Sequence, residues 1–104
     1  MTSLAQTPEP PYFAVIFTSI RTDGDKDYAE TAERMLELAR QQPGFLGFES
    51  ARQEIGISVS YWSNEGAIRA WKQNLEHLQA QGRANEWYSA FRVRVCRVER
   101  EYGV

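Results

Sequence analysis

Residues 12–21, YFAVIFTSIR, constrain the fold of this 104-residue chain more than any other segment. The segment is rich in β-branched and aromatic residues and has the length of a strand. Both of its alternating sets are apolar, namely Tyr12, Ala14 and Ile16 on one side and Phe13, Val15 and Phe17 on the other. A strand that is apolar on both sides needs cover on both sides. The segment therefore predicts a sheet with a second layer on each face.

The middle of the chain continues with one helix and two strands. Apolar residues at three- and four-residue steps predict a helix over residues 25–42, after a Thr-Asp-Gly-Asp turn. Pro43 and Gly44 end that helix. Residues 45–54 and 57–62 read as strands, and the short link between them predicts an antiparallel hairpin.

The last third of the chain predicts a second helical region and a final strand. Ser63 or Asn64 would cap a helix that has an apolar face and a break near Asn74. A further helical stretch reaches about Tyr88, and residues 91–102 form the last strand, with Val93 and Val95 on one face.

The order strand, helix, strand, strand, helix, strand predicts an α+β fold of the ferredoxin-like βαββαβ type. Its four-stranded antiparallel sheet has helices on one face only. Because the first strand is apolar on both sides, the other face needs a partner. We therefore expect a homodimer with the two sheets packed face to face.

Composition sets the broad class of the protein. The chain is long enough for one domain, expected at residues 12–104, preceded by a flexible tail at residues 1–11. The net charge of −2, with acids and bases interleaved, predicts neither nucleic-acid nor membrane binding. No apolar run is long enough to span a membrane and the N-terminus lacks the pattern of a secretory signal, so we expect a cytoplasmic protein.

Few side chains carry metal or redox chemistry. Cys96 is the single cysteine, which rules out an internal disulfide, and it is expected to be a buried, inert thiol. Asp23, Asp25 and Asp27 cluster in a turn but lack the remaining ligands of a calcium loop, so they are interpreted as solvated acids at a helix start. No metal or cofactor motif is evident, and none is predicted.

The three tryptophans and the one histidine fall within 26 residues, which marks this region as the lining of any ligand site. Trp62 and Trp71 would form an aromatic wall for a planar substrate, or a plain helix–sheet core. His77 would act as a general acid or base, or be a half-exposed helical residue hydrogen-bonded to a carboxylate such as Glu76.

Further residues complete the predicted site. Tyr88 and Phe91 would supply apolar walls for a substrate, and the Tyr88 hydroxyl would orient a substrate oxygen. The alternative is that Trp87 and Tyr88 close the end of the sheet. Arg83, Arg92 and Arg94 are candidates to hold a carboxylate or phenolate. Arg92 and Arg94 alternate with valines and are expected to pair with acids across strands or at a dimer seam.

Four segments together resemble the antibiotic biosynthesis monooxygenase superfamily of dimeric α/β barrels, over roughly residues 12–102. They are QQPGFLGFESAR (residues 41–52), ISVSYW (57–62), AIRAWKQNLEH (67–77) and GRANEWY (82–88). The resemblance implies one of several activities, including oxygenation of polyphenolic polyketides with dioxygen and no metal or flavin, and haem degradation.

The residues disfavour the haem-degrading branch of that family. Of the Asn, Trp and His that this branch uses, Trp71 matches the Trp, whereas the Asn and His positions hold approximately Phe17 and Gln81. His77 as a displaced ligand stays open. We therefore predict a cofactor-independent, monooxygenase-like protein acting on a small aromatic or quinol-type molecule. The alternative is a non-catalytic, dimeric protein that binds a small ligand, haem included.

Overall fold

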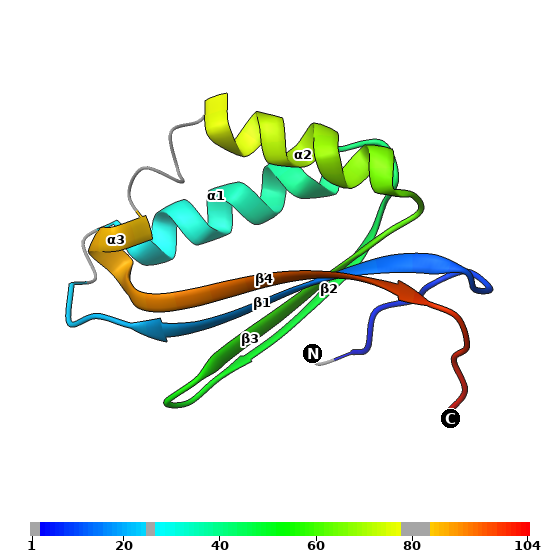
Figure 1. Ribbon diagram of the computed structural model, residues 1–104, viewed down its shortest axis with the longest axis horizontal. Helices are drawn as coiled ribbons and strands as arrows, with labels where there is room; N and C mark the ends of the chain where they lie inside the picture. Colours follow the sequence, from blue (N-terminus) through cyan, green and yellow to red (C-terminus); the bar gives the residue numbers. More distant parts are fainter. Residues whose placement is uncertain (1–2, 25–26, 78–83) are drawn as a thin grey trace.

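The computed structural model describes residues 3–24, 27–77 and 84–104, without the side chains of residues 76, 77, 84 and 85. Its elements are β1 (Tyr12–Arg21), α1 (Tyr28–Arg40), β2 (Phe45–Arg52), β3 (Gly56–Trp62), α2 (Glu65–His77), α3 (Ala84–Trp87) and β4 (Tyr88–Val98). The strands form one antiparallel sheet in the order β2-β3-β1-β4, and the helices lie on one face of it (Figure 1). The ferredoxin-like prediction is confirmed.

The helix α1 is shorter than predicted at both ends. It begins at Tyr28 because Asp27, at its N-cap, has a left-handed backbone with φ 61°. A residue in that conformation cannot belong to a right-handed helix. After the helix ends at Arg40, Gly44 has φ 87° and its carbonyl accepts a 2.8 Å hydrogen bond from the Ser63 N–H. Glycine suits this turn because the conformation is costly for residues with a Cβ.

The helix α2 confirms one prediction and corrects another. Asn64 caps it, since the Asn64 Oδ1 accepts a 2.7 Å hydrogen bond from the Ala67 N–H. The predicted break at Asn74 is wrong, because α2 continues to His77. The Asn74 side chain instead donates a 3.2 Å hydrogen bond to the Gln42 Oε1 at the end of α1. Asparagine has only a slightly unfavourable helix propensity, which is too small to end a helix that packs against the rest of the protein.

The last strand begins and ends earlier than predicted. β4 starts at Tyr88, directly after α3, and ends at Val98. Tyr88 pairs with Arg21, and the pairing register with β1 shifts between Ile20 and Arg21. This irregularity lets the strand start among residues that read as helical in the sequence, because pairing to β1 overrides local propensity.

Strand pairing shows which side chains face the helices. Trp62 is opposite Phe13, and its ring stacks with Trp71 of α2. Residues 13, 15, 17 and 19 of β1 therefore lie on the helix side, because alternate residues of a strand point to opposite faces. Trp62 has no exposed surface and forms the centre of this layer.

The opposite side of the sheet, here called the helix-free face, is partly covered by the two ends of the chain. Tyr12 and Ala14 are only 4% and 5% exposed there. Tyr12 bonds to Thr7 and Glu101, one from each terminal segment. The apolar pattern on this side of β1 is thus satisfied in part by the chain itself, so it does not by itself require a partner.

A hydrogen-bonded carboxylate fixes the N-terminal segment to the same face. The Glu49 oxygens accept a 2.9 Å bond from the Ala5 N–H and a 2.6 Å bond from the Tyr61 hydroxyl. Elsewhere this face exposes Ile20 and Ile57, at 46% and 48%, beside the exposed Arg92 and Arg94. The homodimer stays a prediction that this exposed surface motivates.

Candidate functional site

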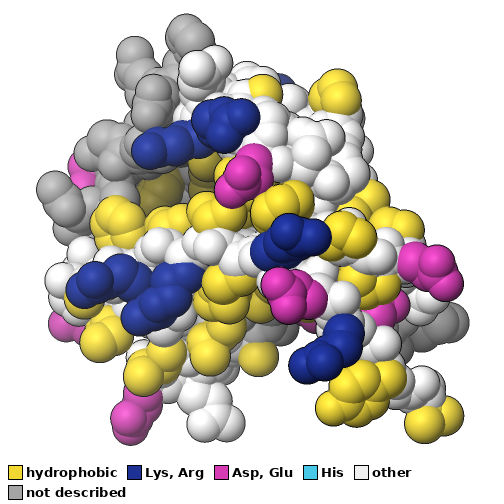
Figure 2. Space-filling view, turned by 45° about the vertical axis from the view of Figure 1, so that its right-hand side comes forward, with side chains coloured by type: hydrophobic (Ala, Val, Ile, Leu, Met, Phe, Trp, Pro, Cys, Tyr) yellow, Lys and Arg dark blue, Asp and Glu magenta, His cyan; other side chains and the backbone are white. Residues whose placement is uncertain are grey.

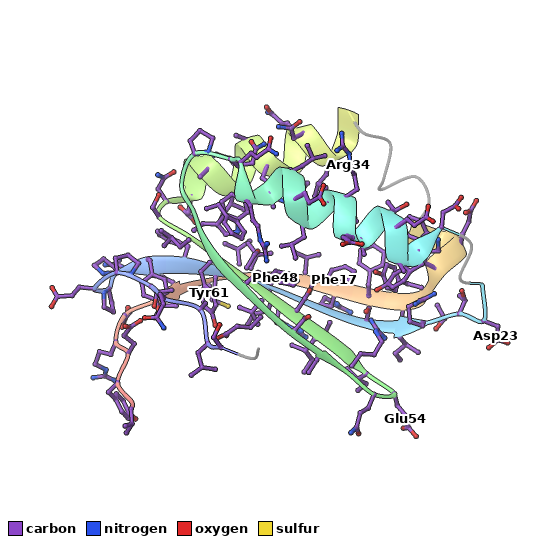
Figure 3. All side chains as sticks on the ribbon, turned by 180° about the vertical axis from the view of Figure 1, so that it is seen from behind. Phe17, Asp23, Arg34, Phe48, Glu54 and Tyr61 are labelled. Atoms are coloured by element: carbon purple, nitrogen blue, oxygen red, sulfur yellow. The ribbon has the colours of Figure 1, made fainter. Side chains whose placement is uncertain are left out.

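The helix side of the sheet carries an aromatic cluster where β1 ends and β4 begins, made of Phe17, Tyr28, Trp87, Tyr88 and Phe91. The Tyr88 ring centroid lies 5.2 Å from that of Phe17, 5.8 Å from that of Tyr28 and 6.2 Å from that of Phe91. Most of these pairs meet edge to face, the geometry that ring quadrupoles favour. Phe17 lies on the stretch of sheet that runs beneath α1 (Figure 3).

Tyr88 supplies the polar group at the centre of this cluster. Its hydroxyl donates a 3.2 Å hydrogen bond to the Tyr28 hydroxyl. Burial, and then this hydrogen bond, raise the pKa of Tyr88 far above its usual value. The phenol therefore stays protonated at neutral pH. Tyr88 can donate to a substrate oxygen when the Tyr28 hydroxyl becomes the donor within the pair, but it cannot serve as a general base there.

Arg21 holds the outer edge of the cluster. Its guanidinium carbon lies 3.5 Å from the centroid of the Tyr28 ring, which is a cation–π contact. Its Nε also donates a 3.0 Å hydrogen bond to the Trp87 carbonyl. These contacts tie the end of β1 to α1 and α3, and so fix the two tyrosines relative to the sheet.

Three apolar side chains of β4, here called the β4 strip, face the helix side without being buried. Phe91, Val93 and Val95 lie opposite Ser19, Phe17 and Val15 of β1, yet they are 47%, 50% and 51% exposed. A band of hydrophobic side chains is visible at the height between helices and sheet, with Lys and Arg above and below it (Figure 2). The helices thus cover the inner strands and leave the apolar side of β4 available to a ligand.

Trp62 and Trp71 take different positions in this layer. Their ring centroids are 6.3 Å apart, with 28° between the planes. Trp62 also packs against Phe45 and donates a 2.9 Å hydrogen bond from its Nε1 to the Ser60 Oγ. Because Trp62 has no exposed surface, it supports the half-buried Trp71 from beneath. Of the two indoles, Trp71 is the one with surface to offer a ligand.

The structure brings only part of the predicted site together. Tyr88 and Phe91 share the aromatic cluster, and Trp71 stands on α2. Arg83 and the side chain of His77 lie outside the described residues, so their roles stay predictions. In the part of the chain that the structure describes, no three metal-binding side chains gather.

Three other residues lie on the helix-free face. Arg92, Arg94 and Cys96 pair with Thr18, Ile16 and Ala14 of β1, whose side chains are on that side of the sheet. They cannot reach the aromatic cluster through the sheet. Cys96 is half-buried rather than fully buried.

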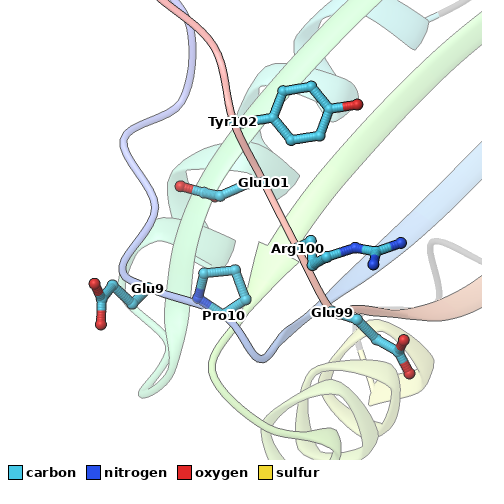
Figure 4. Close-up of a pocket in the computed structure, with 6 residues that line it drawn as sticks. All are labelled: Glu9, Pro10, Glu99, Arg100, Glu101 and Tyr102. Atoms are coloured by element: carbon cyan, nitrogen blue, oxygen red, sulfur yellow. The ribbon is translucent and has the colours of Figure 1, made fainter.

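A separate hollow lies between the two ends of the chain (Figure 4). It is lined by Glu9, Pro10, Glu99, Arg100, Glu101 and Tyr102. These residues adjoin the Tyr12–Val98 end of the β1–β4 pair, whereas the aromatic cluster lies at the other end. Most of the lining is charged, and Tyr102 is 98% exposed. Such a surface offers little enclosure to an apolar ligand.

Two residues of the site were not singled out by the sequence. Tyr28 lies within the helix predicted over residues 25–42, and nothing in the sequence marks it as a hydrogen-bond partner of Tyr88. Arg52 lies within the strand predicted over residues 45–54, and its guanidinium bonds to Ser19 of β1. The alternation of the strands carries the only signal, because it places Arg52 and Ser19 on one face once the register is known.

Comparison with known proteins places this geometry in a family. Residues 11–83 match the family model described as antibiotic biosynthesis monooxygenase. The chain belongs to this family. It is 49% identical over 104 residues to the uncharacterized protein YqjZ of Bacillus subtilis (strain 168), covering 97% of this chain and 91% of that protein.

Solved structures support the same fold. A point mutant of SnoaB, a cofactor-independent oxygenase from Streptomyces nogalater, superposes with a TM-score of 0.73 at 11% identity, over 88% of this chain and 97% of that one. A point mutant of MhuD, with two manganese protoporphyrin IX molecules per active site, superposes with a TM-score of 0.67 at 23% identity, over 88% and 99%. At these identities the likeness to both structures establishes the fold.

Within the described residues, no helix has both the length and the hydrophobicity needed to cross a membrane. The cytoplasmic location stays a prediction.

Proposed function

We propose that this protein is a cofactor-independent oxygenase that acts on a small aromatic or quinol-type molecule on the helix side of its sheet. The exposed β4 strip carries the proposal. Phe91, Val93 and Val95 are on the side that the helices would bury, but about half of each side chain remains accessible. A planar apolar ligand would bury this surface, at about 25 cal/mol for each Å² removed from water. The oxygenase activity of SnoaB supports this choice among the chemistries of the fold.

In this proposal the aromatic cluster binds and orients the substrate, whereas Trp71 lies over Trp62, toward the other end of β1. Phe91 supplies the exposed ring surface, and the hydroxyl pair of Tyr88 and Tyr28 supplies a proton donor for a substrate oxygen. His77, at the end of α2, takes the proton of a phenolic hydroxyl. The resulting anion is richer in electrons and can pass one to dioxygen. The residues of the site therefore need only bind the substrate, orient it and remove its phenolic proton.

Oxygen consumption tests this function. A panel of hydroquinones and naphthols should give steady dioxygen uptake that His77→Ala abolishes, because the variant lacks the base. Tyr88→Phe should keep binding but lower the rate, because it keeps the ring and loses the donor. Lys72→Gln, on the solvent side of α2, is the matched control and should behave like the wild type. The absence of turnover across the whole panel would contradict the proposal.

A second function, ligand binding without turnover, is favoured by one observation. The described cluster consists of the rings of phenylalanine, tyrosine and tryptophan with Arg21 and Arg52 beside it, so it contains no imidazole or carboxylate that could act as a base. His77, whose side chain lies outside the described residues, is the predicted base. If ligands raise the melting temperature and quench Trp71 fluorescence but no product forms, the protein is a binding module.

Haem is one ligand to test for that module, because a porphyrin occupies the active site of MhuD. Cys96 is on the helix-free face and cannot serve as a ligand on the helix side, so His77 is the candidate axial ligand. Titration with haemin should give a Soret band that His77→Ala shifts. An unchanged free-haemin spectrum would remove haem from consideration.

We also propose that two copies associate through the helix-free face. Ile20 and Ile57 leave an apolar area there beside the part that the terminal segments cover. A second copy would meet it with the same surface, as a two-fold axis requires. Light scattering at micromolar concentration should give twice the mass of one chain.

A further inference from the structure

Arg52 lies in an unusual position on the helix side of the sheet. Arg52, Gly56 and Ser19 are directly opposite one another across β2, β3 and β1. The Arg52 side chain lies flat over Gly56, where an added Cβ would overlap the guanidinium. Its two terminal nitrogens donate to Ser19, one to the Oγ and one at 3.4 Å to the carbonyl. Glycine at position 56 therefore makes room for the arginine.

The charge of this guanidinium has no counter-ion in the described part of the chain. Both acceptors of its hydrogen bonds belong to Ser19 and are neutral, and among the described carboxylates none lies within 4.0 Å of Arg52. Ser19 is only 1% exposed, but Arg52 remains exposed. A guanidinium has five N–H donors, so about three are still available here. Such a group, held by a buried anchor, is preorganised for a carboxylate.

The aromatic surface begins directly beside this group. Ser19 pairs with Phe91 of β4, so the row Arg52, Gly56, Ser19, Phe91 crosses the whole sheet on its helix side. Tyr88 lies next to Phe91, with ring centroids 6.2 Å apart. The positive charges of Arg52 and Arg21 both reach Tyr88 and lower its pKa, against the larger effect of burial. Cationic and apolar surfaces thus adjoin along one row.

We propose that the ligand of this protein is a planar aromatic carboxylate, whose carboxylate binds Arg52 and whose ring covers Phe91 and Tyr88. This rests on the proposed function, since it names the substrate class of the same site. A carboxylate on the free N–H groups of Arg52 supplies the missing counter-ion. Its ring then extends one strand spacing over Ser19 onto the β4 strip, which is the direction in which apolar surface is exposed. Arg52 acts here as a binding residue that sets ligand choice.

Calorimetric titration with two matched probes tests this inference. The probes are 2-naphthoate and its neutral counterpart 2-naphthamide, which share the ring and differ in charge. The wild type should bind 2-naphthoate at least tenfold more tightly, as expected for a hydrogen-bonded charge pair. Arg52→Gln should remove that preference and leave the affinity for 2-naphthamide unchanged. Gly56→Ala should do the same, because its methyl group displaces the guanidinium while the arginine is kept.

The controls separate binding from folding. Arg40→Gln removes an equal charge from the exposed end of α1 and should keep the full preference. If Arg52 only stabilised the packing of the β2–β3 hairpin against β1, Arg52→Gln would lower the affinity for both probes equally. That result would show the inference to be wrong. Equal wild-type affinities for the two probes would overturn the carboxylate but leave the aromatic site standing. If neither probe binds, the aromatic site fails and this inference fails with it.

Discussion

Replacing Trp62 by phenylalanine should destabilise the fold by about 3 kcal/mol. Trp62 is 0% exposed, and its Nε1 donates a 2.9 Å hydrogen bond to the Ser60 Oγ. Phenylalanine has about three fewer heavy atoms, which at ~0.8 kcal/mol for each buried carbon costs about 2 kcal/mol. Loss of the hydrogen bond adds about 1 kcal/mol. A domain of this size is stable by about 5–15 kcal/mol, so the variant still folds.

Urea unfolding followed by far-ultraviolet circular dichroism measures this loss. With a slope of about 1.5 kcal/mol per molar, the midpoint should fall by about 2 M. Protomer concentration must be equal in all samples, because association would shift the midpoint. The control is Trp71→Phe, which removes the half-buried partner of the stacked pair and should cost only about 1 kcal/mol. A larger effect at Trp71 than at Trp62, or no effect at Trp62, would refute this account of the core.

Three further predictions concern the turn, the bonded tyrosine and the helix-free face. Gly44→Ala should cost about 2 kcal/mol in urea unfolding, because φ is 87° and the new Cβ would lie 2.8 Å from that of Ala67; an unchanged midpoint would contradict this strain. Burial and the hydrogen bond to Glu49 raise the pKa of Tyr61 to about 12, so its contribution to stability is complete below pH 10 and is lost as the pH rises through 12. Ultraviolet titration should show one tyrosine fewer ionising near pH 12 in Tyr61→Phe than in the wild type. If the missing tyrosine instead ionised near pH 10, the hydrogen bond to Glu49 would be contradicted. Ile57→Glu should halve the mass measured by light scattering, because it places a charge on a 48% exposed apolar side chain of the proposed interface; a wild-type mass in the variant would exclude this face.

The sheet was predictable because its signals are local and repeat. The two-sided apolar pattern of residues 12–21 and the short link after β2 identify a central strand and a hairpin, and both are present. Helix ends were less predictable because they depend on single backbone conformations. Because Asp27 has a left-handed backbone, α1 begins only at Tyr28, and no pattern in the sequence predicts that conformation. The early start of β4 at Tyr88 depends on pairing with Arg21, which is a contact between distant residues.

The candidate site was predictable in its location and less so in its members. Tyr88 and Phe91 were identified because aromatic residues gather just before the last strand, and they do form one cluster. Trp62 was expected either to line the site or to lie in the core, and its complete burial places it in the core. The Arg52–Ser19 bond joins residues 33 positions apart, so only the register of three strands reveals it. Contacts that depend on strand pairing across a sheet cannot be predicted from patterns along the sequence alone.

The bonds that hold the two ends of the chain against the helix-free face have a practical consequence for recombinant work. Both termini emerge on the side of the sheet away from the helices (Figure 1). An affinity tag fused to either end follows the segments that bond to Tyr12 and Glu49, on the same face of the sheet as the exposed Ile20 and Ile57. Tags should therefore be cleaved before any mass measurement, whereas an internal label in an exposed position of α1 or α2 leaves that surface untouched.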